Sequence, residues 1–192
     1  MNKITSDEWL SSIVGKPVYE LKAFETNLKP NDFPTGQIFI WSKIPTDNID
    51  KLICLQRLGF YIVDTNVQFS LSKKISHKNK SNLRFANSSD EADLRALARN
   101  AFKYNRFIRD PNISSEIASK IKEEWVGNFF LGKRGKWMIV IEDNSKIIGF
   151  LQLISKNQNT IVIDLIAIDE KSRGKGLAME MISFAYENCL KK

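Results

Sequence analysis

The spacing of hydrophobic and polar residues changes along the chain and separates predicted strands from predicted helices. Three long apolar stretches, at 137–141, 147–154 and 161–168, are separated by polar turns and predict a meander of three strands. Before them, candidate capping serines at 88–89 and 114–115 each precede apolar residues at helical spacing, which predicts two helices. After them, a glycine-rich turn leads into a last predicted helix over 176–190.

The first part of the chain has shorter elements and ends in a polar segment. Its pattern predicts a strand at 36–42, a helix from about 47 to 58 that ends at Gly59, and strands at 60–63 and 67–71. Residues 73–82 are rich in lysine, serine and asparagine and show no apolar periodicity. With a further strand at 82–86, we expect a small N-terminal αβ domain (1–73), a linker (74–81) and a larger α/β domain (82–192).

Composition restricts the class of protein. The chain has 192 residues, of which 43% are hydrophobic and 27% are charged, as in ordinary globular domains. No apolar run approaches the roughly 18 residues that suggest a membrane span. The start, Met1 to Trp9, lacks the basic-then-apolar layout of a signal peptide. We therefore expect a cytoplasmic protein without a membrane partner.

Histidine, cysteine and net charge restrict the chemistry. The single histidine, His77, lies in the polar segment, which disfavours a Ser-His-Asp triad and a histidine-built metal site, so no metal is predicted. Cys54 and Cys189 lie in apolar segments and are expected to be reduced thiols in or near the core. The net charge of +7 comes without an aromatic-basic nucleic-acid motif. We expect no nucleic-acid partner, but an attraction for small anionic ligands such as CoA or a nucleotide sugar.

The turn between the last strand and the last helix carries the clearest chemistry. Gly174 and Gly176 let the backbone turn tightly and approach a ligand, and the small Ala178 permits close contact. The unsatisfied N–H groups of a helix start, together with the helix dipole, bind phosphate groups, and Arg173 and Lys175 add positive charge. The Gly-Lys-Ser/Thr ending of a P-loop is missing, and the preceding meander does not fit a Rossmann unit. The alternative is a plain strand-to-helix turn with solvated charges.

The stretch Arg173-Gly-Lys-Gly-Leu-Ala178 resembles the Gln/Arg-x-x-Gly-x-Gly/Ala pattern of GNAT acyltransferases, and the apolar strand before it fits as well. This resemblance implies the GNAT fold, a mixed and mostly antiparallel sheet flanked by helices, with acetyl-CoA as cosubstrate. It also implies a pantetheine arm paired with the strand backbone and a pyrophosphate bound by the turn. The residues implied are Leu165, Ile166, Ala167 and Ile168 for the arm, and Arg173, Gly174, Lys175, Gly176, Leu177 and Ala178 for the pyrophosphate.

A second resemblance lies in the middle of the chain. Residues 101–111, followed by Trp125, are similar to the Phe-x-x-Ser-Arg-Phe-x-x-Asp-Pro…Trp pattern of dTDP-fucosamine acetyltransferase relatives, with Asn105 where serine is commoner. Leu58-Gly-Phe60 and Val67 to Leu71 also resemble the small first domain of that group. The resemblance implies a nucleotide-linked deoxyamino sugar as the small-molecule amine substrate, in surface polysaccharide or lipopolysaccharide biosynthesis. Arg106 and Asp110 then either pair with each other or contact the substrate, with arginine suited to its phosphates.

In this family the backbone N–H of Ile168 or a close neighbour would polarise the thioester oxygen, and a base must remove the amine proton. Asp164 is a candidate base, with a solvated or ion-paired surface group as the alternative. A complete domain of the family continues past the last helix with a segment that carries a tyrosine general acid and a pantetheine-binding asparagine. The sequence as given ends at Lys192. We therefore expect either a truncated domain or one completed by a partner chain, so that catalytic competence of the 192 residues is open.

Two other functions remain open at this stage. One is a GNAT enzyme that acts on a protein or a small amine, and the other is a non-catalytic module that binds acetyl-CoA or a partner. The oligomeric state is open too, with a homodimer among the options.

Overall fold

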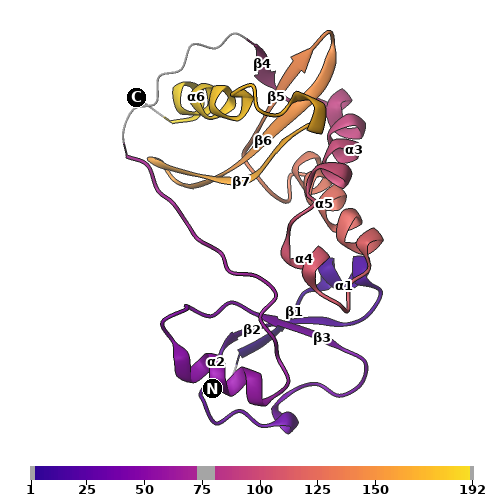
Figure 1. Cartoon of the computed structure of the whole chain (residues 1–192), viewed down its shortest axis with the longest axis vertical. Helices are drawn as coiled ribbons and strands as arrows, with labels where there is room; N and C mark the ends of the chain where they lie inside the picture. The colour runs from indigo at the N-terminus through magenta and orange to yellow at the C-terminus, as the bar shows by residue number, and fades with distance from the viewer. Residues whose placement is uncertain (1–2, 73–80, 191–192) are drawn as a thin grey trace.

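The computed structural model describes residues 3–72 and 81–190, which form two β-sheets connected by helices (Figure 1). The first sheet has the order β1-β2-β3, with β2 antiparallel to β1 and parallel to β3. Its elements are β1 (Lys3–Ser6), α1 (Glu8–Val14), β2 (Val18–Ala23), β3 (Phe39–Ser42) and α2 (Ile49–Arg57). His77 and most of the expected linker at 74–81 lie outside the described residues.

The second sheet is antiparallel throughout, in the order β4-β5-β6-β7. The predicted meander is confirmed, with strands longer than expected because pairing continues to the turns. Asn144 and Ser145 both have positive φ angles, which fits the two-residue turn that joins β5 to β6. The strands are β4 (Asn82–Phe85), β5 (Trp137–Asp143), β6 (Lys146–Asn157) and β7 (Thr160–Ile168).

Helices cover both faces of the second sheet, as expected for this fold class. Helices α3 (Glu91–Ala101) and α5 (Ser115–Phe130) pack on one face, and α6 (Leu177–Cys189) packs on the other. Each face buries an apolar cluster, which explains why the central strands β5 and β6 are apolar on both sides. None of the helices in residues 3–72 and 81–190 is long and apolar enough to cross a membrane.

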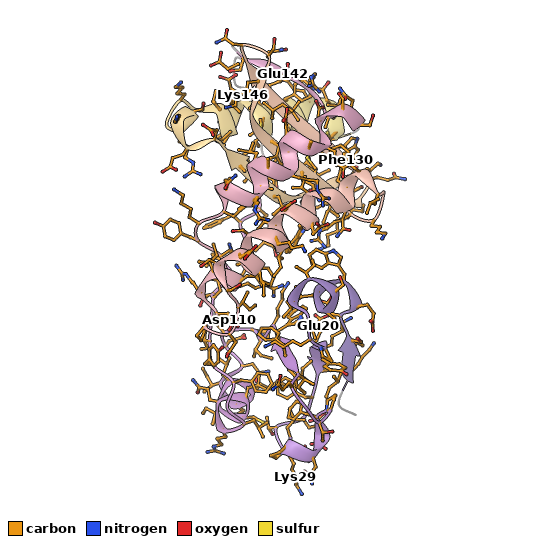
Figure 2. All side chains as sticks on the ribbon, turned by 90° about the vertical axis from the view of Figure 1, so that its right-hand side faces the viewer. Glu20, Lys29, Asp110, Phe130, Glu142 and Lys146 are labelled. Atoms are coloured by element: carbon orange, nitrogen blue, oxygen red, sulfur yellow. The ribbon has the colours of Figure 1, made fainter. Side chains whose placement is uncertain are left out.

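The two halves of the molecule share a core at their junction, where α1 and the short helix α4 (Arg106–Arg109) meet α5 (Figure 1). Trp9 of α1 packs edge-on against Trp125 of α5, with 5.9 Å between ring centroids. Asp110 lies at the same junction, between the helices and the first sheet (Figure 2). The buried residues of this cluster are Leu10, Val18, Phe107, Ile113, Ala118 and Ile121.

The strands predicted at 60–63 and 67–71 are wrong, because this segment pairs with no described strand. Phe60 packs against the core of the first part of the chain, but most of the later apolar side chains are exposed, with Phe69 at 90% and Val67 at 67%. Alternation predicts an amphipathic strand, but a strand without a pairing partner is not stable in water. Conversely, the sequence pattern missed β1, α1 and β2, which are short.

Candidate functional site

The glycine loop, residues 173–178, connects the end of β7 to α6. After a 3-10 turn at Glu170–Ser172, the backbone adopts left-handed φ angles of 79° at Gly174 and 80° at Gly176. Side chains rarely tolerate this conformation, which explains the glycine at each position. A Cβ built on either residue meets no atom within 4 Å. The face of the loop toward which these atoms would point is therefore open.

Unpaired N–H groups follow one another along this loop. The N–H groups of residues 174–178 donate no hydrogen bond within the described part of the chain, whereas those of Met179 and Glu180 donate to the carbonyl of Gly176. Gly176 is the N-cap of α6, a helix of 13 residues. Unpaired donors at the positive end of a helix dipole form a binding site for phosphate groups.

Arg173 holds the loop in place through its side chain. Its Nε donates to the carbonyl oxygen of Ile168 at 3.0 Å, and a terminal nitrogen donates to that of Ala101 at 3.2 Å. The guanidinium thus connects the loop to the ends of β7 and α3. Lys175 is exposed and forms no ion pair with the described residues, so it is the loop cation that remains available to a ligand.

Strand β7 provides the second part of the site. It is at the edge of its sheet, so its outer backbone groups pair with no described strand. Leu165 and Ala167 pack toward the cluster beneath α3 and α5, while Ile166 and Ile168 pack toward α6. Because their side chains anchor the strand on both faces, its backbone edge is available for hydrogen bonds with an extended ligand.

A β-bulge in β7 directs Asp164 out of this regular pattern. Ile163 pairs with Leu153 and Leu165 with Gln152, so Asp164 is the extra residue. The Asp164 side chain is only 7% exposed. Its carboxylate accepts two hydrogen bonds from Arg134, at 2.7 and 2.6 Å. The indole N–H of Trp125 and the amide of Gln152 each donate to Oδ2 at 3.1 Å.

These contacts weaken the candidate role of Asp164 as the base. A base needs an accessible lone pair, and Arg134 together with two further donors already occupies both oxygens of the carboxylate. The alternative of an ion-paired group fits better, although the Asp164 side chain is only 7% exposed.

Arg106 and Asp110 do not form the ion pair that was one of the two sequence expectations. The Arg106 guanidinium lies 4.7 Å from the ring centroid of Trp41 and 4.6 Å from that of Phe107. Asp110 is buried and accepts hydrogen bonds from the Tyr61 hydroxyl at 2.8 Å and from the Asn112 N–H at 2.9 Å. The ion pair does not form because the Asp110 carboxylate binds the 60–72 segment through Tyr61, while the Arg106 side chain faces the first sheet.

Asn105 caps α4, which explains how it can replace serine at this position. Its side-chain oxygen accepts from the N–H groups of Phe107 and Ile108, at 2.9 and 3.3 Å. Serine and asparagine are both favoured N-cap residues. The departure from the family pattern therefore preserves the local structure.

Lys122 is a site residue that sequence reasoning missed. It is 9% exposed, and its Nζ lies 4.5 Å from the ring centroid of Trp125, 5.1 Å from Phe102 and 5.8 Å from Phe107. Burial lowers its pKa to about 8, with a contribution from the charge of Arg106. A lysine on the apolar stripe of a helix, four residues after Ala118, is the signal that could have identified it.

We expect the stability of the protein to rise with pH between about 8 and 10.5 because of Lys122. In this window the unfolded chain, with the ordinary lysine pKa of 10.5, binds a proton that the folded chain has released. Lys122→Met should remove this dependence and raise the free energy of unfolding at pH 7 by about 2 kcal/mol. Urea unfolding at pH 7 and pH 9 measures both effects, and Lys120→Met, an exposed lysine on the same helix, is the control. Equal pH dependence in Lys122→Met and the wild type would contradict the expectation.

Residues 99–192 match the family model described as "Acetyltransferase (GNAT) family", which confirms the resemblance found in the glycine loop. The chain is 25% identical over 195 residues to the spore coat polysaccharide biosynthesis protein SpsD of Bacillus subtilis, covering 91% of this chain and 65% of that protein. It is 27% identical over 147 residues to dTDP-fucosamine acetyltransferase of Escherichia coli, covering 76% of this chain and 62% of that protein. The chain thus spans slightly less than two thirds of the length of these relatives.

Among solved structures, the chain is similar to the GNAT family N-acetyltransferase YhbS from Escherichia coli in complex with CoA. The two are 18% identical with a TM-score of 0.43, over 57% of this chain and 58% of that one.

Proposed function

We propose that this protein is an N-acetyltransferase that transfers the acetyl group of acetyl-CoA to an amine, because residues 99–192 match the model of the acetyltransferase (GNAT) family. The observation that carries the proposal is the row of N–H groups over residues 174–178 that have no partner among the described residues, next to an edge of β7 that pairs with no described strand. This arrangement suits a ligand that joins a pyrophosphate to an extended, amide-bearing arm.

In the proposed donor site, the glycine loop binds the pyrophosphate and β7 binds the arm. Residues 174–178 supply backbone donors, and Lys175 supplies a cation at the opening. The edge of β7 over Leu165 to Ile168 pairs with the amides of the pantetheine arm, as an added strand would. Arg173 acts as a positioning residue, because it fixes the loop relative to the end of that strand.

The transfer step needs little chemistry from side chains. The neutral amine nitrogen attacks the thioester carbonyl carbon and the carbon–sulfur bond breaks. The nitrogen gives up one proton and the thiolate takes one up, directly or through water, so that CoA leaves as the thiol. A backbone N–H near Ile168 stabilises the negative charge that develops on the carbonyl oxygen. Most of the rate enhancement then comes from holding the amine and the thioester in reactive geometry.

For the acceptor we propose a nucleotide-linked deoxyamino sugar. Two observations support this substrate class: the similarity to dTDP-fucosamine acetyltransferase and the packing of an N-terminal sheet against α4 and α5. The sheet adds a second wall beside the helices, which suits an acceptor larger than a free amine. Arg106 of α4 faces this sheet at Trp41, and Asp110 orders the adjoining segment through Tyr61.

A thiol-release assay tests the proposal, with the protein expressed from its complete reading frame. We expect CoA to be released from acetyl-CoA when a nucleotide-linked 4-amino-4,6-dideoxy sugar is added, and far less with the free amino sugar. Faster release with a lysine peptide would instead indicate a protein acetyltransferase. Acetyl-CoA binding by calorimetry without turnover of any amine would favour a binding module and contradict the proposed activity.

A further inference from the structure

Two positive charges are enclosed at the junction of the two halves. Lys122 Nζ and the Arg106 guanidinium lie 5.8 and 4.6 Å from the centroid of the same ring, that of Phe107. Neither forms an ion pair or a hydrogen bond with the described residues. Each has its pKa lowered mainly by burial, and the charge of Arg106 lowers that of Lys122 further. Like charges enclosed together destabilise a fold unless something neutralises them.

The nearby carboxylates are engaged elsewhere. Asp164 is bound to Arg134, and Asp7 caps α1 through the N–H of Leu10. Glu20 lies 3.4 Å from Lys22. Asp7, Glu20 and Asp64 favour the charged form of Arg106, but none lies within ion-pair distance of it. Arg106 and Lys122 therefore have no carboxylate partner of their own among the described residues.

A third donor at this position also lacks a partner. The indole Nε1 of Trp41, whose ring lies against Arg106, is buried and has no acceptor among the described residues. Buried donors are nearly always paired. The Lys122 nitrogen differs from it, because it remains in contact with solvent although the residue is 9% exposed. It can therefore meet a ligand.

We propose that Arg106 and Lys122 bind a phosphate group of the acceptor substrate. The inference rests on the proposed function, and it names the site that would receive the nucleotide end of the acceptor. The pyrophosphate of a nucleotide-linked sugar carries one negative charge on each phosphate, so that it can contact both cations, whereas a carboxylate neutralises only one. The acceptor's ammonium group is repelled from these cations, which orients the amine away from them.

The protonation of Lys122 provides a test that does not depend on turnover. In protein with 13C-labelled lysine, the signal absent in Lys122→Met identifies Lys122, and its titration is followed with and without inorganic pyrophosphate. The experiment is done with CoA present, so that the glycine loop is occupied. Bound phosphate should raise the pKa of Lys122 from about 8 by at least about one unit, since it stabilises the ammonium form.

Calorimetry gives the matching affinities. Lys122→Met and Arg106→Gln should each weaken pyrophosphate binding about tenfold or more. Lys120→Met, on the same helix but exposed, should leave it unchanged. An unchanged Lys122 titration, or equal affinity in Lys122→Met and Lys120→Met, would overturn the assignment. If acetate at matched ionic strength raised the pKa of Lys122 as much as pyrophosphate does, the preference for phosphate would be overturned.

Failure of this inference and failure of the proposed function give different results. Protein that binds acetyl-CoA while Lys122 titrates unchanged retains its donor site and loses only the assigned acceptor contact. Protein that fails to bind acetyl-CoA while pyrophosphate raises the pKa of Lys122 retains the anion site and loses the proposed activity.

Discussion

Replacing Gly176 with valine is expected to reduce acetyl-CoA affinity at least about 100-fold. The residue has a φ of 80°, which a β-branched side chain avoids, and its missing Cβ would lie on the open face of the loop. Valine would therefore both turn the N–H groups away and occupy the space of the pyrophosphate. Losing two charge-assisted hydrogen bonds, each worth about 1.5–3 kcal/mol, accounts for the size of the effect. Isothermal calorimetry with acetyl-CoA measures it.

Gly15→Val is the matched control for this substitution. Gly15 has nearly the same φ, 78°, and a Cβ there also meets no atom within 4 Å. It caps the C-terminus of α1, away from the glycine loop. Both variants suffer backbone strain of about 1–2 kcal/mol, so both should unfold earlier, but only Gly176→Val should lose the ligand. A folded Gly176→Val protein with wild-type affinity would exclude the loop as the pyrophosphate site.

Replacing Asp164 with alanine should lower the free energy of unfolding by about 3–4 kcal/mol. The change removes four hydrogen bonds and leaves Arg134 stacked on Trp125, at 4.5 Å from its ring centroid, without a counterion. Removing one partner of a buried ion pair costs about 3–5 kcal/mol. The Arg134 side chain is 38% exposed and can turn toward water, which places the expected loss in the lower part of that range. Urea unfolding at pH 7 measures the loss.

Glu170→Gln provides the comparison with an exposed pair. Glu170 lies 2.7 Å from Lys103, but both side chains are largely exposed, and such pairs contribute little. The urea midpoint of unfolding of Glu170→Gln should match that of the wild type. Wild-type stability in Asp164→Ala would show that the cluster does not stabilise the fold, and would return Asp164 to candidacy as a base. In that case a fully folded Asp164→Asn protein should show a large loss of kcat.

The expectations that held depend on contacts close together in sequence. The hairpins of β5, β6 and β7 follow from apolar stretches interrupted by short polar turns, and α6 follows from a glycine turn before an apolar helix. Each of these strands can pair with the stretch next to it in the sequence, so few other arrangements compete with the hairpins. The segment at 60–71 has strand-like apolar patterns too, but no described strand pairs with it, so local pattern alone gave a wrong prediction there.

The candidate site divides in the same way. The sequence by itself determined the loop at 173–178, because left-handed glycines and a helix start produce unpaired donors through local backbone geometry. Only the tertiary structure decided the partners of Arg106, Asp110 and Asp164, and the burial of Lys122 among three rings. Ion pairs and pKa values depend on which distant charges and rings come within a few ångströms, and the fold determines those distances.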